Sequence, residues 1–172
     1  MSYKTEPLSS SHKKKNFACG KTLLDNYLHT QAKQDMKRKL SVCFILADSQ
    51  NNVQGYYTLS NSSIQRELLS DEIRNKLPHS YTNLPTTLLG RLAIDNAYKG
   101  KGLGATLLID ALKRAYDTSV TSIGSMAVVV DPIDGEAKGF YAKYGFIHLP
   151  DSGKMFLPME TISHLFKDAW TE

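Results

Sequence analysis

One segment, LLGRLAIDNAYKGKGLGATLLIDALKRA at residues 88–115, constrains the fold more than any other part of the chain. It begins as a short apolar run typical of a buried strand and ends with apolar residues at helical spacing. Three glycines, Gly100, Gly102 and Gly104, lie between these parts among lysines. Glycines at the start of a helix allow close approach of an anion, and the unpaired first amides of the helix bind phosphate. The segment therefore predicts a strand, a phosphate-binding loop and a helix.

Two common nucleotide-binding motifs fit the segment or its surroundings poorly. CGKT at residues 19–22 matches the end of a Walker A loop, but Lys15 occupies the position of the first glycine that this loop requires. The first two loop glycines and Ala105 formally match a dinucleotide fingerprint. However, a polar loop follows the end of the strand at Ile94, and the acidic residue expected about 20 positions later is missing. The dinucleotide motif is kept as the weaker alternative.

Length and composition predict one domain over residues 1–172, because no long linker interrupts the chain of 172 residues. A content of 41% hydrophobic and 22% charged residues excludes disordered, collagen-like and coiled-coil classes. No apolar run approaches the roughly 20 residues of a membrane span, so we expect a soluble cytoplasmic protein with no membrane partner. The net charge of +4 permits an anionic partner without requiring one.

The cysteines and histidines give no indication of a metal site. Cys19 and Cys43 lack the paired spacing of zinc ligands, and the five histidines are scattered along the chain. We therefore expect two free thiols and no metal cofactor.

The periodicity of apolar residues predicts the order of the elements. The expected elements are a helix over 21–37, a hairpin of strands over 42–47 and 53–59, a helical passage near 68–76, a strand over 87–94, a helix over 102–116, a buried strand over 123–130, a helix within 134–146, short strands at 146–149 and 154–159, and a last helix from Pro158. Strands come first and then alternate with helices, which predicts a mixed α/β or α+β class with helices packed on a sheet.

The loop KGKGLG at residues 99–104 resembles the (Gln/Arg)-x-x-Gly-x-(Gly/Ala) loop of the GNAT N-acetyltransferases, with Lys99 where Gln or Arg is usual. The later DGEAKGFYAKYGF resembles the Asn-x-x-Ala…Tyr…Gly-Phe block of the same family, with Asp134 in place of the asparagine. The resemblance implies a central mixed, twisted sheet flanked by helices on both faces, and acetyl-CoA as co-substrate. It also implies that a strand holds the pantetheine arm and that the loop holds the pyrophosphate. The implied residues are Leu92, Ala93 and Ile94 for the arm, and Lys99, Gly100, Lys101, Gly102, Leu103 and Gly104 for the pyrophosphate.

Four further stretches resemble a narrower branch, the GNAT toxins of bacterial toxin–antitoxin modules. They are FACGKTLLDNYL at 17–28, GYYTLS at 55–60, LLGRLAID at 88–95 and FLPM at 156–159. This resemblance implies acetylation of the α-amine of aminoacyl-tRNA, which blocks translation, and neutralisation by a ribbon-helix-helix antitoxin. Homodimers are frequent in the family. The alternatives are a housekeeping GNAT acting on a small amine or a protein N-terminus, and a non-catalytic CoA-binding module, which the departures at Lys99 and Asp134 leave open.

Acetyl transfer from a thioester needs an acid for the departing thiolate, and the resemblance assigns this role to Tyr141. A phenol with a pKa of about 10 stays protonated at neutral pH. No general base stands out, because Asp95, Asp131, Asp134 and Glu136 are more typical of helix caps and loops. An α-amine, with a pKa near 8, needs a weaker base than a lysine amine, with a pKa of about 10.4. The missing base therefore favours an α-amine acceptor.

Basic residues indicate where an RNA acceptor would bind. Lys33, Lys37 and Arg38, together with Lys39 and residues 13–15, predict a patch that follows phosphates. Arg91 lies inside an apolar strand, where an arginine must meet a partner or reach a cleft. A structural ion pair and a substrate contact are both open for Arg91.

Overall fold

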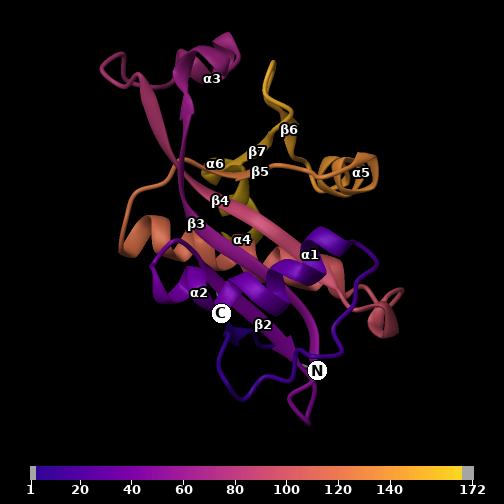
Figure 1. The fold of residues 1–172 in the computed structure, drawn as a ribbon. Coiled ribbons are helices and arrows are strands. Elements are labelled where there is room, and N and C mark those ends of the chain that lie inside the picture. The colour runs from indigo at the N-terminus through magenta and orange to yellow at the C-terminus, as the bar shows by residue number, and fades with distance from the viewer. Residues whose placement is uncertain (1–2, 168–172) are drawn as a thin grey trace. The chain divides into compact units, whose positions relative to one another are not determined.

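The computed structural model describes residues 3–167, and its central feature is a seven-stranded sheet with the strand order β1-β2-β3-β4-β5-β7-β6 (Figure 1). The strands are β1 (Glu6–Pro7), β2 (Val42–Ala47), β3 (Val53–Gln65), β4 (Asn83–Ile94), β5 (Ala127–Val130), β6 (Ile147–His148) and β7 (Met155–Pro158). The helices are α1 (Thr22–Asn26), α2 (Ala32–Lys37), α3 (Asp71–Arg74), α4 (Leu103–Thr121), α5 (Gly135–Lys143) and α6 (Met159–Phe166), with a π-helical turn η1 (Tyr27–Gln31) and 3-10 turns η2 (Arg66–Leu68) and η3 (Asn96–Tyr98). This mixed sheet with helices confirms the predicted class.

The chain forms two compact units that share the long strands β3 and β4. The first unit contains the chain up to Ser60 together with Leu89–Ala111, and the second contains Asn61–Leu88 and the chain from Leu112 onward. In the first unit, β2 pairs antiparallel with β1 and with β3. In the second unit, β7 pairs antiparallel with β5 and with β6. A single functional domain over residues 1–172 stays a prediction.

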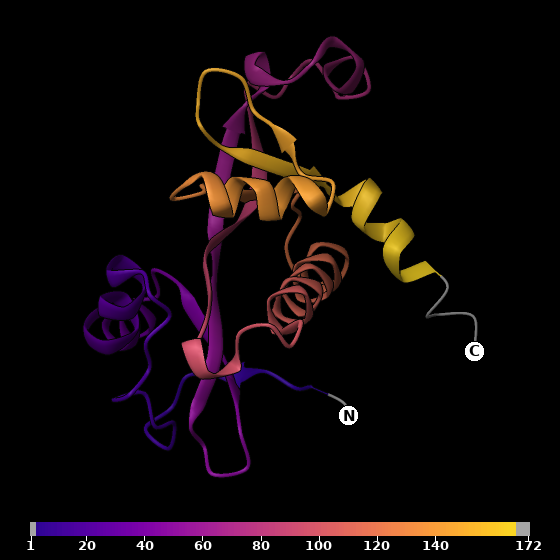
Figure 2. The same ribbon diagram turned by 90° about the vertical axis from the view of Figure 1, so that its right-hand side faces the viewer.

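In the first unit, helices cover both faces of the strands. Neighbouring side chains of β3 point to opposite faces, so the adjacent buried residues Tyr56 and Tyr57 each need a helix to cover them. Tyr56 packs on one face, where its hydroxyl donates a hydrogen bond to the Leu24 carbonyl of α1 at 2.6 Å. Tyr57 packs on the other face, where its hydroxyl donates to the Asp110 carboxylate of α4 at 2.5 Å. Figure 2 shows α1 and α2 on one side of these strands and the start of α4 on the other.

The close packing in this unit requires a glycine at position 55. A Cβ atom there would lie 2.7 Å from Cδ1 of Ile94 and 2.9 Å from both the Ala93 carbonyl oxygen and Cδ1 of Leu107. Real Cβ atoms do not approach other atoms so closely, so Gly55 leaves the space that the Ile94 and Leu107 side chains and the β4 backbone occupy. The second unit has its own core, formed by the apolar residues Ile64, Leu69, Leu84, Ala127, Val129, Leu149 and Phe156.

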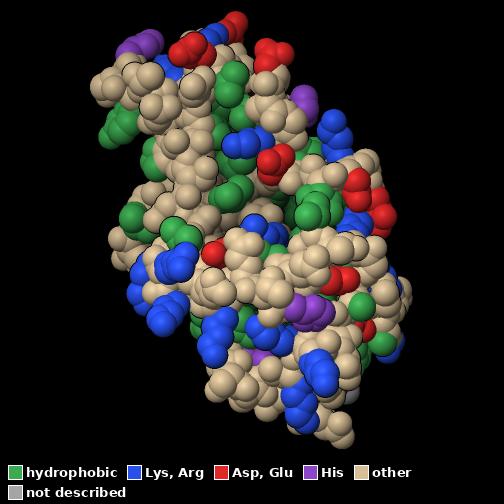
Figure 3. Space-filling model, viewed as in Figure 1, with side chains coloured by type: hydrophobic (Ala, Val, Ile, Leu, Met, Phe, Trp, Pro, Cys, Tyr) green, Lys and Arg blue, Asp and Glu red, His purple; other side chains and the backbone are tan. Residues whose placement is uncertain are grey.

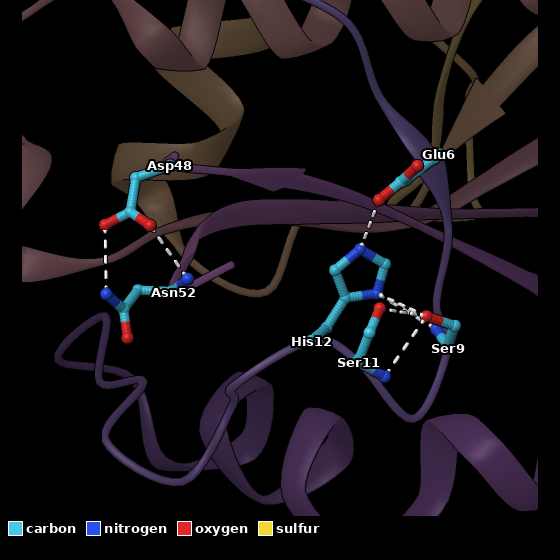
Figure 4. Close-up of polar contacts among 6 residues, drawn as sticks. All are labelled: Glu6, Ser9, Ser11, His12, Asp48 and Asn52. Atoms are coloured by element: carbon cyan, nitrogen blue, oxygen red, sulfur yellow. Dashed lines mark hydrogen bonds and ion pairs between the residues drawn. The ribbon is translucent and has the colours of Figure 1, made fainter. Parts of the chain in front are cut away.

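The segment before the first helix is fastened by polar contacts that the sequence did not predict (Figure 4). Nδ1 of the buried His12 ring accepts the Ser9 amide hydrogen at 2.9 Å, and Nε2 lies 2.7 Å from a Glu6 carboxylate oxygen. Because Nδ1 is an acceptor, Nε2 carries the hydrogen and donates it to Glu6. Asp48 similarly closes the turn after β2 by accepting hydrogen bonds from the Asn52 amide and side chain. These contacts hold β1 and the β2–β3 turn in place.

Most predicted elements are present, but several boundaries were wrong. The helix over 21–37 is interrupted by the π-helical turn η1, and β3 continues to Gln65 instead of ending at Leu59. The passage near 68–76 forms only η2 and the four-residue α3. The strand expected from Ile123 begins at Ala127, because the Ile123 amide still donates to the Thr118 carbonyl at the end of α4. Among residues 3–167, no helix is both long and apolar enough to cross a membrane.

Candidate active site

The glycine loop leads directly into the long helix α4, as the sequence predicted. Gly100 and Gly102 have φ values of +78° and +74°, which side-chain-bearing residues rarely adopt. A Cβ atom at either position would have no atom within 4 Å, so these glycines are required by backbone conformation and not by packing. The Thr106 amide donates to the Gly102 carbonyl at 3.2 Å and closes the first helical turn. The preceding amides therefore have no acceptor within the helix and can bind an anion.

The turn η3 before the glycine loop is held by two carboxylates. Asp95 accepts hydrogen bonds from the Ala97 amide at 2.9 Å and the Ala18 amide at 3.0 Å. Asp48 accepts a hydrogen bond from the Tyr98 hydroxyl at 3.1 Å, and this lowers the pKa of Asp48 in addition to the larger effect of the Asn52 amide. The Lys101 ammonium lies 5.5 Å from the centroid of the Tyr98 ring. The rigid turn thus fixes where the loop begins.

Lys99 makes a contact that its position in the sequence does not predict. Its ammonium donates a hydrogen bond to the Cys19 carbonyl at 2.5 Å, and the neighbouring Asn96 amide donates to the Ala18 carbonyl at 2.8 Å. These bonds tie residues 17–20 to the glycine loop. Lys99 thus helps to hold the loop, and its expected contact with pyrophosphate stays a prediction.

The strand residues expected to hold the pantetheine arm lie at the end of β4. Ala93 is buried among the core residues of the first unit, so only its backbone can reach a ligand. Leu92 and Ile94 are partly exposed on the face opposite Ala93. Their placement is compatible with the expected role, and the role itself stays a prediction.

Arg91 stacks on an aromatic ring. Its guanidinium carbon lies 3.5 Å from the centroid of the Tyr27 ring, which is van der Waals contact with the ring face. Within residues 3–167, no carboxylate forms an ion pair with Arg91, so the structural ion pair considered for it was wrong. Sequence reasoning missed Tyr27 as its partner because this tyrosine fits the apolar stripe of the helix.

The basic residues on and after α2 are exposed and lie close to one another. Lys33 and Lys37 are four residues apart on α2 and therefore lie on one face, and Arg38 follows as the C-cap. Figure 3 shows lysine and arginine side chains gathered over the part of the first unit that carries α2. Lys14 differs from the expectation for residues 13–15, because its ammonium donates to the Leu28 carbonyl at 3.1 Å.

Tyr141 lies in the second unit, on α5. Asp134 caps this helix by accepting the Ala137 amide hydrogen at 2.8 Å, which is the capping role predicted for this acid. The Tyr141 side chain is 6% exposed and packs against Phe140 and Phe146, with ring centroids 5.3 and 5.2 Å away. Burial raises the pKa of the phenol, so it stays protonated across the neutral range. Within the described chain, no protein group hydrogen-bonds to its hydroxyl.

The remaining candidate ligands do not gather into a metal site. Cys19 and Cys43 are buried free thiols, and burial raises the pKa of Cys43 to about 12. Asp131 and Glu136 are exposed. No group of three His, Cys, Asp or Glu side chains that could hold a metal occurs among residues 3–167.

Comparison with known proteins places these features in a family. The family described as "Acetyltransferase (GNAT) domain" matches residues 39–148. A tRNA-acetylating toxin of Mycobacterium tuberculosis is 33% identical over 131 residues, which are 76% of each chain. The structure of AtaT complexed with acetyl-methionyl-tRNAfMet has a TM-score of 0.87 at 31% identity and covers 96% of this chain and 99% of AtaT. A mutant AtaT toxin bound to the C-terminus of the antitoxin AtaR and acetyl-CoA has a TM-score of 0.80 at 28% identity, covering 95% of this chain and 98% of that one.

These matches span most of the chain and include the glycine loop at the start of α4. The chain belongs to the GNAT acetyltransferase family.

Proposed function

We propose that this protein transfers the acetyl group of acetyl-CoA to the α-amine of aminoacyl-tRNA and thereby blocks translation. The observation that carries the proposal is the likeness, over 96% of this chain, to a toxin solved with an acetylated aminoacyl-tRNA. The sequence identity to a tRNA-acetylating toxin supports the same acceptor. Both the geometry of the glycine loop and the exposed basic residues of α2 agree with a phosphorylated cofactor and a nucleic-acid acceptor.

The glycine loop would bind the pyrophosphate of acetyl-CoA. The amides of Leu103 and Gly104 lie in the first turn of α4, where the helix dipole favours negative charge. The open space over Gly100 and Gly102 leaves room for phosphate oxygens, and Lys101 adds positive charge. The backbone of Leu92 to Ile94 would hold the pantetheine arm, as in other members of the family.

Tyr141 would act as the general acid. The amine nitrogen attacks the thioester carbonyl carbon, the carbon–sulfur bond breaks, and the departing thiolate takes the phenolic proton. The attacking amine loses its own proton to solvent, and that proton restores the phenol. Burial keeps Tyr141 in the protonated form that this step needs. An α-amine with a pKa near 8 is about one-tenth neutral at pH 7, so the absence of a strong base is tolerable.

The same likeness supports an antitoxin partner for this chain. The AtaT toxin is bound to the C-terminus of its antitoxin AtaR. We propose that a small antitoxin protein likewise binds and neutralises the present chain. We further expect that this antitoxin has a ribbon-helix-helix domain and that the present chain forms a homodimer.

The deciding experiment incubates the purified protein with labelled acetyl-CoA and a pool of charged tRNAs, beside polyamines and peptides. Label is expected on the α-amine of one or more aminoacyl-tRNAs. Label only on the small amines or peptides would favour the housekeeping enzyme, and no transfer to any acceptor would favour the non-catalytic module.

A further inference from the structure

Arg91 has an unusual environment for an arginine in the middle of a packed unit. It is partly buried, and its guanidinium lies in contact with the face of the Tyr27 ring. No residue in the described part of the chain accepts a hydrogen bond from it. Buried or partly buried guanidinium groups normally have oxygen partners, because they carry five N–H donors. The natural partner for donors that the protein leaves unused is an anionic group of a ligand.

Tyr27 is held in place by three contacts of its own. Its hydroxyl donates a hydrogen bond to the Asp35 carboxylate at 2.9 Å and lies 3.0 Å from the Ser41 hydroxyl. Its ring stacks with Tyr56 at a centroid distance of 6.3 Å and an interplanar angle of 19°. The side chain is only 4% exposed. Tyr27 is therefore a rigid surface on which Arg91 rests.

The π-helical turn η1 explains how Tyr27 reaches Asp35. In a regular α-helix, a residue eight positions later lies about 80° around the axis from the first. The bond from the Ala32 amide to the Tyr27 carbonyl spans five residues, so the turn takes up one extra residue. Asp35 is thereby placed as if it were seven positions away, within about 20° of Tyr27 around the axis. Asp35 binds the Tyr27 hydroxyl and leaves the charge of Arg91 without a carboxylate partner.

We infer that Tyr27 is a positioning residue that orients Arg91 to bind a phosphate group of the RNA acceptor. The inference rests on the proposed function for the identity of the acceptor. The planar guanidinium matches phosphate oxygens with two parallel hydrogen bonds, and stacking on Tyr27 fixes the direction in which these donors point. The ring thus lowers the entropy that Arg91 loses when the phosphate binds.

A double-mutant cycle on the full-length protein tests the pair. The variants are Tyr27→Met, which removes the aromatic face, Arg91→Lys, which keeps the charge but loses the planar donors, and the combination of both. Affinity for deacylated tRNA is measured by fluorescence anisotropy, and affinity for acetyl-CoA is measured by calorimetry. Each single variant should weaken tRNA binding about ten-fold, because an oriented charge-assisted hydrogen bond is lost. Affinity for acetyl-CoA should stay that of the parent.

The double variant should bind tRNA no more weakly than either single variant, because residues that act as a unit show non-additive effects. Tyr27→Phe keeps the ring and should retain most of the affinity, which separates the role of the ring face from that of the hydroxyl. With charged tRNA as substrate, KM should rise while kcat stays within about two-fold, as expected for lost binding and not lost chemistry. Arg74→Lys is the control: this half-buried arginine pairs with Asp71 in the second unit, and its replacement should change nothing.

Additive losses of tRNA affinity in the cycle would overturn the inference. Parental tRNA affinity in Arg91→Lys would also overturn it. That variant keeps Tyr27 in place, so its result does not depend on whether Tyr27→Met folds. Thermal melting establishes that each variant is folded. Failure of the proposed function has a different signature, because the parent protein would then acetylate no charged tRNA at all. The cycle with deacylated tRNA still decides whether Tyr27 and Arg91 act together on an RNA phosphate.

Discussion

Two residues carry the most specific chemistry at the scale of single side chains. Tyr141 is a buried phenol whose hydroxyl has no hydrogen-bond partner among residues 3–167, and Gly102 supplies a backbone conformation at the start of α4. Both can be changed without removing a packing interaction that the fold depends on. They therefore allow chemistry and cofactor binding to be tested separately.

Tyr141→Phe should lower kcat by about 10² to 10⁴, the range typical of a lost general acid, because the ring remains and only the proton donor is removed. The affinity for acetyl-CoA should stay nearly that of the parent, since the ring contacts with Phe140 and Phe146 are retained. Steady-state kinetics and calorimetry measure the two quantities. A kcat equal to that of the parent would make Tyr141 a core residue only.

Gly102→Val should weaken acetyl-CoA binding by about ten-fold or more, because the side chain fills the open space over the loop and the lost bonds are charge-assisted. The positive φ should also cost about 1–3 kcal/mol of stability. Gly124→Val is the matched control, since Gly124 has open space around it and no positive φ. Equal acetyl-CoA affinity in the two variants would remove the loop from the cofactor site.

At the scale of elements, single polar bonds join segments that are distant in sequence. The Tyr56 hydroxyl joins β3 to α1, the Tyr57 hydroxyl joins β3 to α4, and Lys99 joins residues 17–20 to the glycine loop. The Tyr56 and Tyr57 side chains are buried, so these two bonds satisfy hydroxyl groups that water does not reach. The helices are thus fixed against the strands by specific bonds as well as by apolar packing.

Tyr56→Phe should lower the free energy of unfolding by about 1 kcal/mol, the typical net value of one hydrogen bond. The cost stays low because the Leu24 carbonyl also accepts the Tyr27 amide hydrogen and is not left wholly unpaired. Thermal melting should show a fall in Tm of about 2–4 °C for a chain of this size. Tyr81→Phe, at a side chain that is 51% exposed, should leave Tm unchanged. A parental Tm in Tyr56→Phe would mean that packing alone fixes α1.

At the scale of the whole molecule, the charge is positive overall and includes an exposed cluster on and after α2. Neutralising Lys33, Lys37 and Arg38 would lower the net charge from +4 to +1. The part of the chain that the structure describes provides no ion pair to any of these three residues. They are therefore available to RNA phosphates.

Changing Lys33, Lys37 and Arg38 together to Gln should raise KM for charged tRNA and reduce the slope of log K against log salt by about two to three, because each phosphate contact contributes roughly 0.7–0.9. The matched control changes three exposed lysines of the second unit, Lys76, Lys138 and Lys143, to Gln. It removes the same amount of positive charge. Equal slopes in the two triple variants would show that overall charge, and not the α2 cluster, binds tRNA.

The order and type of most elements, together with the family, could be predicted from the sequence alone. The interval Val42–Ala47 was predicted to the residue because a continuous apolar run is bounded by polar turn residues on one side. The GNAT family was indicated by the glycine loop and the later tyrosine block, and the family match confirms it. Local patterns suffice here because backbone conformation and phosphate binding depend on neighbouring residues.

Contacts between distant residues were decided only by the tertiary structure. The stacking of Arg91 on Tyr27 and the bond from Lys99 to the Cys19 carbonyl each join positions that no local pattern relates. The π-helical turn, which brings Asp35 to the Tyr27 hydroxyl, was likewise not indicated by the spacing of the apolar residues. The sequence by itself thus determined which local backbone conformations are favourable. Which charged and polar side chains contact one another across the fold was decided by the free energy of packing in the tertiary structure.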